Sequence, residues 1–196
     1  MLTSRHSFLT QFLLLPAILM LSLSAVSFAQ PQRGPAPRGT ASFEQWLSQE
    51  VNHQLLLLPR YSVFDYVQYQ INDSEVTLLG QVVSDVMKRD AENNIKRIEG
   101  VTKVTNNIEI LPASQMDDRI RRATFGVLSG DPALGIYRLS LVHSIHIIVK
   151  GGHVTLEGTV LNEGHKNLAG MRAKGVSGVF SVTNNLRIET SKTEQS

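Results

Sequence analysis

The chain has 196 residues, a formal net charge of +2 and 42% apolar residues, which suits one medium domain or two small ones. It contains no cysteine, which excludes disulfide bonds, thiolate nucleophiles, cysteine-ligated zinc and a lipid-modified N-terminal cysteine. Each folded domain must therefore depend on an ordinary apolar core.

Residues 1–29 have the pattern of a secretory signal peptide. A positively charged start precedes an apolar run over residues 8–23, and small residues follow up to Ala29. We expect cleavage after Ala29 and export to the periplasm. The alternative is a retained membrane anchor, but the run contains Pro16 and is shorter than the roughly 20 residues that a spanning helix needs.

Two further segments have no apolar period. Residues 30–41 are rich in Pro, Gly and Arg, which predicts a flexible linker. Residues 190–196 are polar and predict a disordered tail.

Residues 42–112 predict a module with the element order α-β-β-α-β. Ser42 and Gln45 have capping-box spacing at the start of a helix that Pro59 ends. Strands at 67–71 and 76–83 follow, then a helix that Ser84 or Asp85 begins, then a strand at 104–111.

Residues 113–189 predict the same order again. Ser114 begins a helix whose expected apolar stripe is Met116, Ile120, Ala123 and Val127. Strands at 139–149 and 154–161, a helix at 163–174 and a strand at 180–188 complete the module. The predicted fold is α+β: two tandem α-β-β-α-β modules, each a three-stranded mixed sheet covered on one face by two helices.

The two modules also have identical residues at many positions that are 78 residues apart. GVTKVTNNIEI at 100–110 matches GVFSVTNNLRI at 178–188, and VTLLGQV at 76–82 matches VTLEGTV at 154–160. Most of this pattern is a folding signal: a glycine inside a strand allows a bulge or a close helix, and a glycine past a helix end tolerates positive φ. The paired asparagines adopt a left-handed backbone or cap an edge. The shared structural positions are Gly80, Gly100, Val101 and Asn106, with Gly158, Gly178, Val179 and Asn184.

The pattern V-x-L-x-G-x-V, a helix, then G-V-x-x-V-x-N-x-L/I-x-I resembles the BON domain of bacterial envelope and osmotic-stress proteins. The segment LSGDP at 128–132 resembles the family's L-x-x-D-P, whereas the first module reads LLLPR at 56–60. The resemblance spans residues 42–189. It implies an extracytoplasmic protein of tandem modules, without catalysis, in contact with phospholipid surfaces or other envelope components.

The sequence contains no motif of a known catalytic centre. GxSxG, HExxH and Walker-type patterns are absent, so we expect neither an enzyme nor a cofactor. His143 and His146 are three residues apart on a predicted strand, which directs them to opposite faces. Metal binding there would require an irregular backbone, and we expect none.

The charge differs between the modules. Residues 42–112 carry six Lys and Arg against ten Asp and Glu, a net charge of −4, and residues 113–189 carry nine against six, a net charge of +3. The second module therefore suits an anionic surface. On its first helix we expect Arg122 and Phe125 on the solvent side; the alternative is that Phe125 packs against the neighbouring module. The predicted lipid-binding residues are Arg119, Arg121, Arg122, Phe125, Arg138, Lys166, Arg172 and Lys174.

Three functions compete on these grounds. The first is a non-catalytic exported protein that associates with anionic phospholipid membranes and supports envelope integrity or osmotic stress tolerance. The second is a protein-interaction module that binds an envelope partner through sheet edges or the acidic first module. Nucleic-acid binding is disfavoured, because export and an acidic first module both oppose it.

Overall fold

The computed structural model describes residues 39–138 and 145–189. The predicted signal peptide, residues 30–38 of the predicted linker and the predicted tail lie outside the described residues, as do His143 and the first half of the strand predicted at 139–149. Both modules belong to one compact unit. Within the described ranges, no helix has the length and hydropathy that crossing a bilayer requires.

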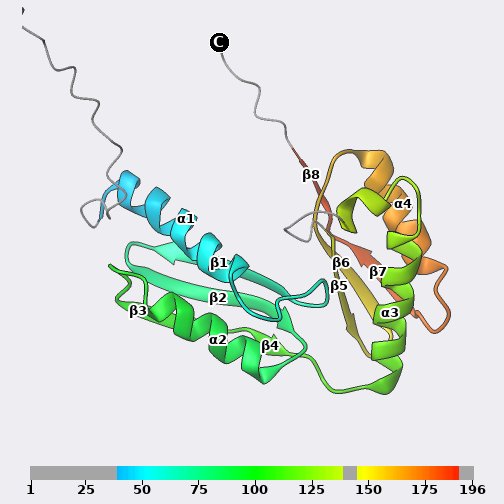
Figure 1. Cartoon of the computed structure of the whole chain (residues 1–196), viewed down its shortest axis with the longest axis horizontal. Helices are drawn as coiled ribbons and strands as arrows, with labels where there is room; N and C mark the ends of the chain where they lie inside the picture. Colours follow the sequence, from blue (N-terminus) through cyan, green and yellow to red (C-terminus); the bar gives the residue numbers. More distant parts are fainter. Residues whose placement is uncertain (1–38, 139–144, 190–196) are drawn as a thin grey trace, which may run out of the picture. The chain divides into compact units, whose positions relative to one another are not determined.

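The first module has the predicted order of elements (Figure 1). It consists of α1 (Ala41–Leu56), β1 (Tyr66–Asn72), β2 (Glu75–Val82), α2 (Asp85–Lys96), β3 (Lys103–Asn106) and β4 (Glu109–Ile110). The buried residues of α1 are Phe43, Leu47, Val51 and Leu55, the stripe that the helical period predicts.

The second module repeats this order and adds one short helix. It consists of α3 (Gln115–Ser129), the 3₁₀ helix η1 (Gly135–Arg138), β5 (Ile145–Lys150), β6 (His153–Val160), α4 (Glu163–Lys174), β7 (Ser181–Asn184) and β8 (Arg187–Ile188). The sequence did not predict η1. The predicted fold class is confirmed.

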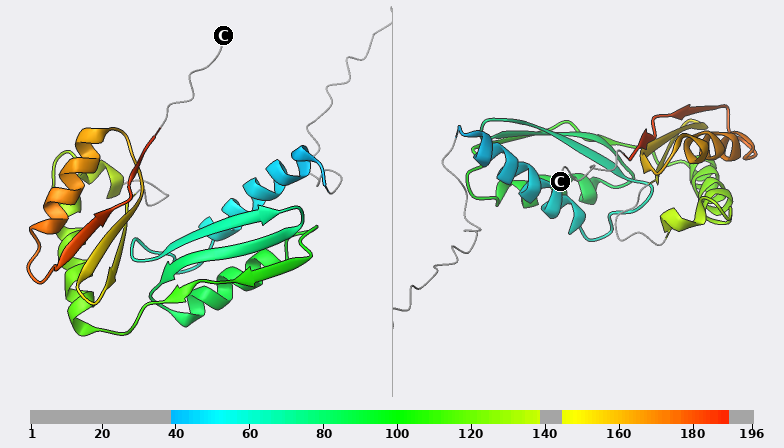
Figure 2. Two further views of the ribbon diagram at one scale, coloured as in Figure 1. Left: turned by 180° about the vertical axis from the view of Figure 1, so that it is seen from behind. Right: turned by 90° about the horizontal axis from the view of Figure 1, so that it is seen from above.

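Each sheet is mixed, and its last strand is interrupted. β1 pairs antiparallel with β2, and β3 and β4 both pair parallel with β2, so together they form the predicted third strand. β5 to β8 repeat this arrangement. In each module the two helices lie on the same side of the sheet, as the right-hand view of Figure 2 shows. Alternate residues of β2 point into that layer, and Val76, Leu78 and Val82 are buried there.

The paired asparagines explain the interruption. Asn106 donates from Nδ2 to the carbonyl oxygen of Lys88 in α2 at 2.9 Å and accepts from the backbone N–H of Ile108 at 3.2 Å. Asn184 makes the same two contacts, with Lys166 of α4 and with Leu186. Neither has positive φ. Each asparagine thus satisfies backbone groups at the break and fastens the strand to its helix.

Two of the three predicted helix N-caps are present, and the glycines that follow α2 and α4 have the expected backbone conformation. Thr40, not Ser42, caps α1, because its side chain accepts from the N–H of Phe43 at 3.1 Å. Ser84 and Ser114 cap α2 and α3 as predicted. Gly100 and Gly178 have φ of 91° and 87°, which confirms the expected positive φ.

Candidate functional site

The helix α3 is rotated about its axis relative to the sequence prediction. Met116, Ala123 and Val127 were expected on its buried stripe, and all three are exposed. The buried residues are Asp117, Ile120, Arg121, Thr124 and Leu128. Of the predicted stripe, Ile120 is buried and the other three residues are not, because the charged residues Asp117 and Arg121 take part in the buried face.

Asp117 and Arg121 satisfy backbone groups of the strand hairpin beneath α3. The Asp117 carboxylate accepts from the N–H groups of Gly151 at 2.9 Å and Gly152 at 2.8 Å in the β5–β6 turn. The Arg121 guanidinium donates to the carbonyl oxygen of Val149 at 2.7 Å and pairs with Asp118. Arg121 is 4% exposed, so it is not part of an accessible lipid-binding surface.

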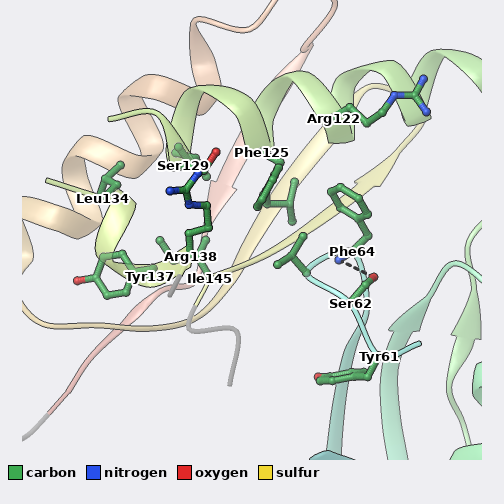
Figure 3. A pocket seen from close by; sticks show the side chains of 13 residues that line it. Tyr61, Ser62, Phe64, Arg122, Phe125, Ser129, Leu134, Tyr137, Arg138 and Ile145 are labelled. Carbon is green, nitrogen blue, oxygen red and sulfur yellow. Dashed lines mark hydrogen bonds between the residues drawn. The ribbon is translucent and has the colours of Figure 1, made fainter. Parts of the chain in front are cut away.

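Phe125 follows the alternative interpretation of the sequence. Its ring is half-buried and meets the ring of Phe64, from the first module, edge to face at 6.3 Å between centroids. Figure 3 shows the two rings at one side of a pocket. The expectation of a solvent-exposed Phe125 beside Arg122 is therefore wrong, because the loop before β1 covers it.

Arg172 is held in an ion pair. Its Nε donates to Oδ2 of Asp131 at 2.8 Å, and Oδ1 of Asp131 accepts from the N–H of Ala133 at 2.9 Å. The backbone N–H of Ala133 and the Arg172 guanidinium hold the pKa of Asp131 below its usual range. Asp131 lies in the LSGDP segment, so this segment fastens the end of α3 to α4.

Apolar side chains are exposed on both α3 and α4, and exposed basic side chains lie on the same two helices. Met171 is 65% exposed, Met116 43% and Val127 39%. Val127 and Met171 line one groove of about 550 Å³ between the two helices. Arg119 and Lys174 are exposed, and neither takes part in an ion pair within the described residues. We call Met116, Arg119, Val127, Met171 and Lys174 the α3–α4 face.

The helix α2 of the first module lacks the exposed methionine and the free lysine that α4 has at the equivalent positions within the described residues. Moving back 78 residues from Met171 and Lys174 gives Asn93 and Lys96. Lys96 pairs with Glu92, and the residue equivalent to Glu92 in α4 is Gly170. The second module thus has an apolar side chain in place of an amide, and a lysine whose acidic partner is gone.

The remaining predicted lipid-binding residues lie elsewhere. Lys166 is half-buried on α4, next to the strand that Asn184 fastens. Arg122 and Arg138 are exposed and line the pocket of Figure 3, which has a volume of about 390 Å³. Sequence reasoning did not find Met116, Val127 and Met171 as surface residues; a comparison of the two modules at the offset of 78 would have indicated Met171.

His146 is buried in β5 beside two aromatic rings. Its ring centroid lies 5.6 Å from that of Tyr61 and 5.2 Å from that of Tyr66. In residues 39–138 and 145–189, no group of three or more His, Asp or Glu side chains is placed to hold a metal ion.

These features define a class: a tandem pair of small α+β modules whose polar clusters fasten secondary structure together. A model of the BON domain matches residues 44–112 and 117–190. The chain belongs to the BON domain family and contains two such domains in tandem. Proteins with this domain are typically associated with the cell envelope and are generally non-catalytic.

Two solved structures of CdsD, a structural protein of the type III secretion system of Chlamydia trachomatis, one of them of its C-terminal domain, are similar to this chain at 12% identity and a TM-score of 0.26. Each similarity covers 74% of this chain, and 98% and 93% of the two CdsD chains. No curated protein sequence matches the chain.

Proposed function

We propose that this protein is a non-catalytic, exported BON-domain protein that docks reversibly on anionic phospholipid membranes through the α3–α4 face, and that this docking supports envelope integrity or osmotic stress tolerance. One observation carries the proposal. The second module exposes Met171 beside Lys174, which has no ion-pair partner in residues 39–138 and 145–189, whereas the first module has Asn93 and an ion-paired Lys96 at the same positions.

The chemistry of the face suits the boundary between headgroups and acyl chains. Moving exposed methionine and valine side chains out of water lowers the free energy of the system. Each basic residue near an anionic leaflet adds about 1 kcal/mol to the free energy of membrane binding. A single face with two such cations binds weakly. Its affinity decreases as salt rises, because charges are screened over about 8 Å at physiological ionic strength.

Co-sedimentation with vesicles tests the proposal. The purified protein should sediment with phosphatidylcholine vesicles that contain phosphatidylglycerol, and much less with phosphatidylcholine alone. Lys174→Glu and Met171→Asn should each weaken binding to the anionic vesicles, the former by at least about fivefold, because it removes one attractive charge and adds a repulsive one.

The first module supplies matched controls. Asn93→Ser changes the helix position equivalent to Met171 and should leave vesicle binding unchanged. Lys96→Glu adds negative charge to the first module and should weaken binding by less than Lys174→Glu does, because it acts only through long-range repulsion. Equal sedimentation with both vesicle types, or an equal loss in the Lys96→Glu variant, would contradict docking through the α3–α4 face. Recovery of a protein partner through the first module at high salt would instead favour the protein-interaction function.

A further inference from the structure

The pocket of Figure 3 is a second feature of the molecule, separate from the α3–α4 face. Its walls come from α3, from η1, from β5 and from the loop before β1. The inner wall belongs to the apolar core of the second module, in which Leu128, Leu134, Ile145 and Ile147 are buried. A volume of about 390 Å³ lies within the roughly 300–1,000 Å³ of small-ligand sites.

The loop that closes the pocket is held in place by hydrogen bonds. Asp65 is buried, and its Oδ2 accepts from the N–H of Ser62 at 3.1 Å and from the Ser62 hydroxyl at 2.7 Å, while its Oδ1 accepts from the N–H of Val83 at 2.9 Å. The N–H of Ile147 donates to the carbonyl oxygen of Val63 at 2.7 Å. The pocket is thus preformed, and a ligand does not have to order this wall.

Among the described residues that line the pocket, the charged side chains are two arginines. Arg122 on α3 and Arg138 on η1 are exposed and line the pocket from two different elements (Figure 3). Neither takes part in an ion pair within the described residues. None of the 13 described side chains that line the pocket is acidic. The Tyr61 phenol, whose pKa burial raises to about 12, adds no negative charge to the lining at physiological pH.

We infer that this pocket binds a single-chain anionic amphiphile: one alkyl chain with a carboxylate or phosphate head. The chain lies against the apolar inner wall, and a guanidinium of Arg122 or Arg138 holds the head. Two observations select this ligand. The wall is apolar, which favours an alkyl chain over a polar metabolite. Neither arginine has an ion-pair partner in the part of the chain that the structure describes, which favours an anionic head over a neutral or cationic one.

Isothermal titration calorimetry below the micelle-forming concentration tests the inference. Dodecanoate should bind at one saturable site. Decanoate and octanoate have shorter chains and should bind more weakly, by about fourfold for each methylene removed. Dodecyl maltoside has the same chain length and a neutral head, and it should bind more weakly. Dodecyl phosphate distinguishes the two anionic heads, because the tighter of it and dodecanoate identifies the head.

Two variants localise the site. Arg138→Gln should weaken dodecanoate binding about fivefold, and Ser129→Phe should abolish it by placing a ring in the pocket, while circular dichroism and the thermal midpoint report the fold. Arg97→Gln removes an exposed arginine of the first module and is the control. Binding that does not saturate, binding that is independent of chain length, equal binding of dodecyl maltoside, or unchanged binding in both variants would overturn the inference.

The pocket and the α3–α4 face can fail independently. Ser129→Phe should still sediment with anionic vesicles, and Met171→Asn should still bind dodecanoate. If the protein binds dodecanoate but does not sediment with anionic vesicles, the pocket inference is supported and membrane docking is refuted. If the protein sediments with anionic vesicles but does not bind dodecanoate, membrane docking is supported and the pocket inference is refuted.

Discussion

At the scale of single residues, the glycines inside the strands are required by the backbone. Gly80 has φ of 113° and lies opposite Val67 of the neighbouring strand. A Cβ atom built on Gly80 would be 2.0 Å from the carbonyl oxygen of Tyr66. Gly158 has the same φ of 113°, so the repeated G in V-x-L-x-G-x-V marks one backbone conformation, used twice. The sequence predicted either a bulge or a closely packed helix at this glycine. The backbone that approaches Gly80 belongs to the neighbouring strand β1, not to a helix.

We therefore predict that Gly80→Ala destabilises the protein by about 3 kcal/mol, because alanine is strained at this φ and its methyl group clashes with backbone. Urea unfolding followed by circular dichroism measures this change. Gly126→Ala is the matched control. Gly126 lies in α3 with nothing within 4 Å of the added Cβ, so this substitution should stabilise by about 1 kcal/mol. Equal effects of the two substitutions would refute the argument.

At the scale of secondary structure elements, charged side chains on the first helix of the second module take the place of apolar side chains on the first helix of the first module. The buried face of α1 includes Phe43 and Leu47, whereas the buried face of α3 includes Asp117 and Arg121. Asp117 accepts hydrogen bonds from the β5–β6 turn, Arg121 donates one to β5, and Asp131 is joined to α4 by its ion pair with Arg172. The position of α3 thus depends on hydrogen bonds from charged side chains.

The Asp131–Arg172 pair predicts a pH dependence of stability. The pKa of Asp131 is lowered in the folded state, so its contribution is fully present above the unfolded pKa of about 4 and is lost as pH falls through the folded pKa. Asp131→Asn should lower the urea midpoint at pH 7. The difference from the unsubstituted protein should shrink as pH falls toward about 3.

A comparison of variants isolates this contribution, because Glu92 and Glu109 also have lowered pKa values and add to the acid sensitivity of the whole chain. Asp85→Asn is the control, since Asp85 pairs with Arg89 on an exposed surface of α2 and such pairs contribute little. A midpoint difference for Asp131→Asn that stays constant from pH 7 downward would contradict the assigned role.

At the scale of the whole molecule, the near-neutral net charge hides two modules of opposite sign, −4 over residues 42–112 and +3 over residues 113–189. An anionic surface therefore attracts one module and repels the other. The repulsion acts over a longer range than any contact, so salt weakens it along with the attraction.

Neutralising acids of the first module should strengthen vesicle binding. Glu44 and Glu99 are exposed, and neither takes part in an ion pair within the described residues. The double variant Glu44→Gln, Glu99→Gln should sediment more completely with anionic vesicles at low salt, and this gain should vanish at about 1 M salt, where screening acts within about 3 Å. The test is co-sedimentation over a salt series. A gain that persists at high salt would show that the long-range charge of the first module is not its cause.

The sequence alone determined the local and repeated features of this protein. The offset of 78 residues, the alternation of apolar residues in the strands and the helix caps at Ser84 and Ser114 predicted the tandem α+β modules and the BON resemblance. These signals are local, since each depends on the period of one element or on neighbours a few residues apart.

The surfaces were decided only by tertiary structure. A helical period shows which residues share a face but not which face is buried when charged residues can be satisfied by distant backbone. The N–H groups of Gly151 and Gly152, 34 and 35 residues from Asp117, turned that carboxylate inward, and so left Met116 and Val127 exposed. The loop carrying Phe64 likewise covered Phe125 and formed the pocket. Such contacts join segments far apart in the chain, and no local pattern encodes them.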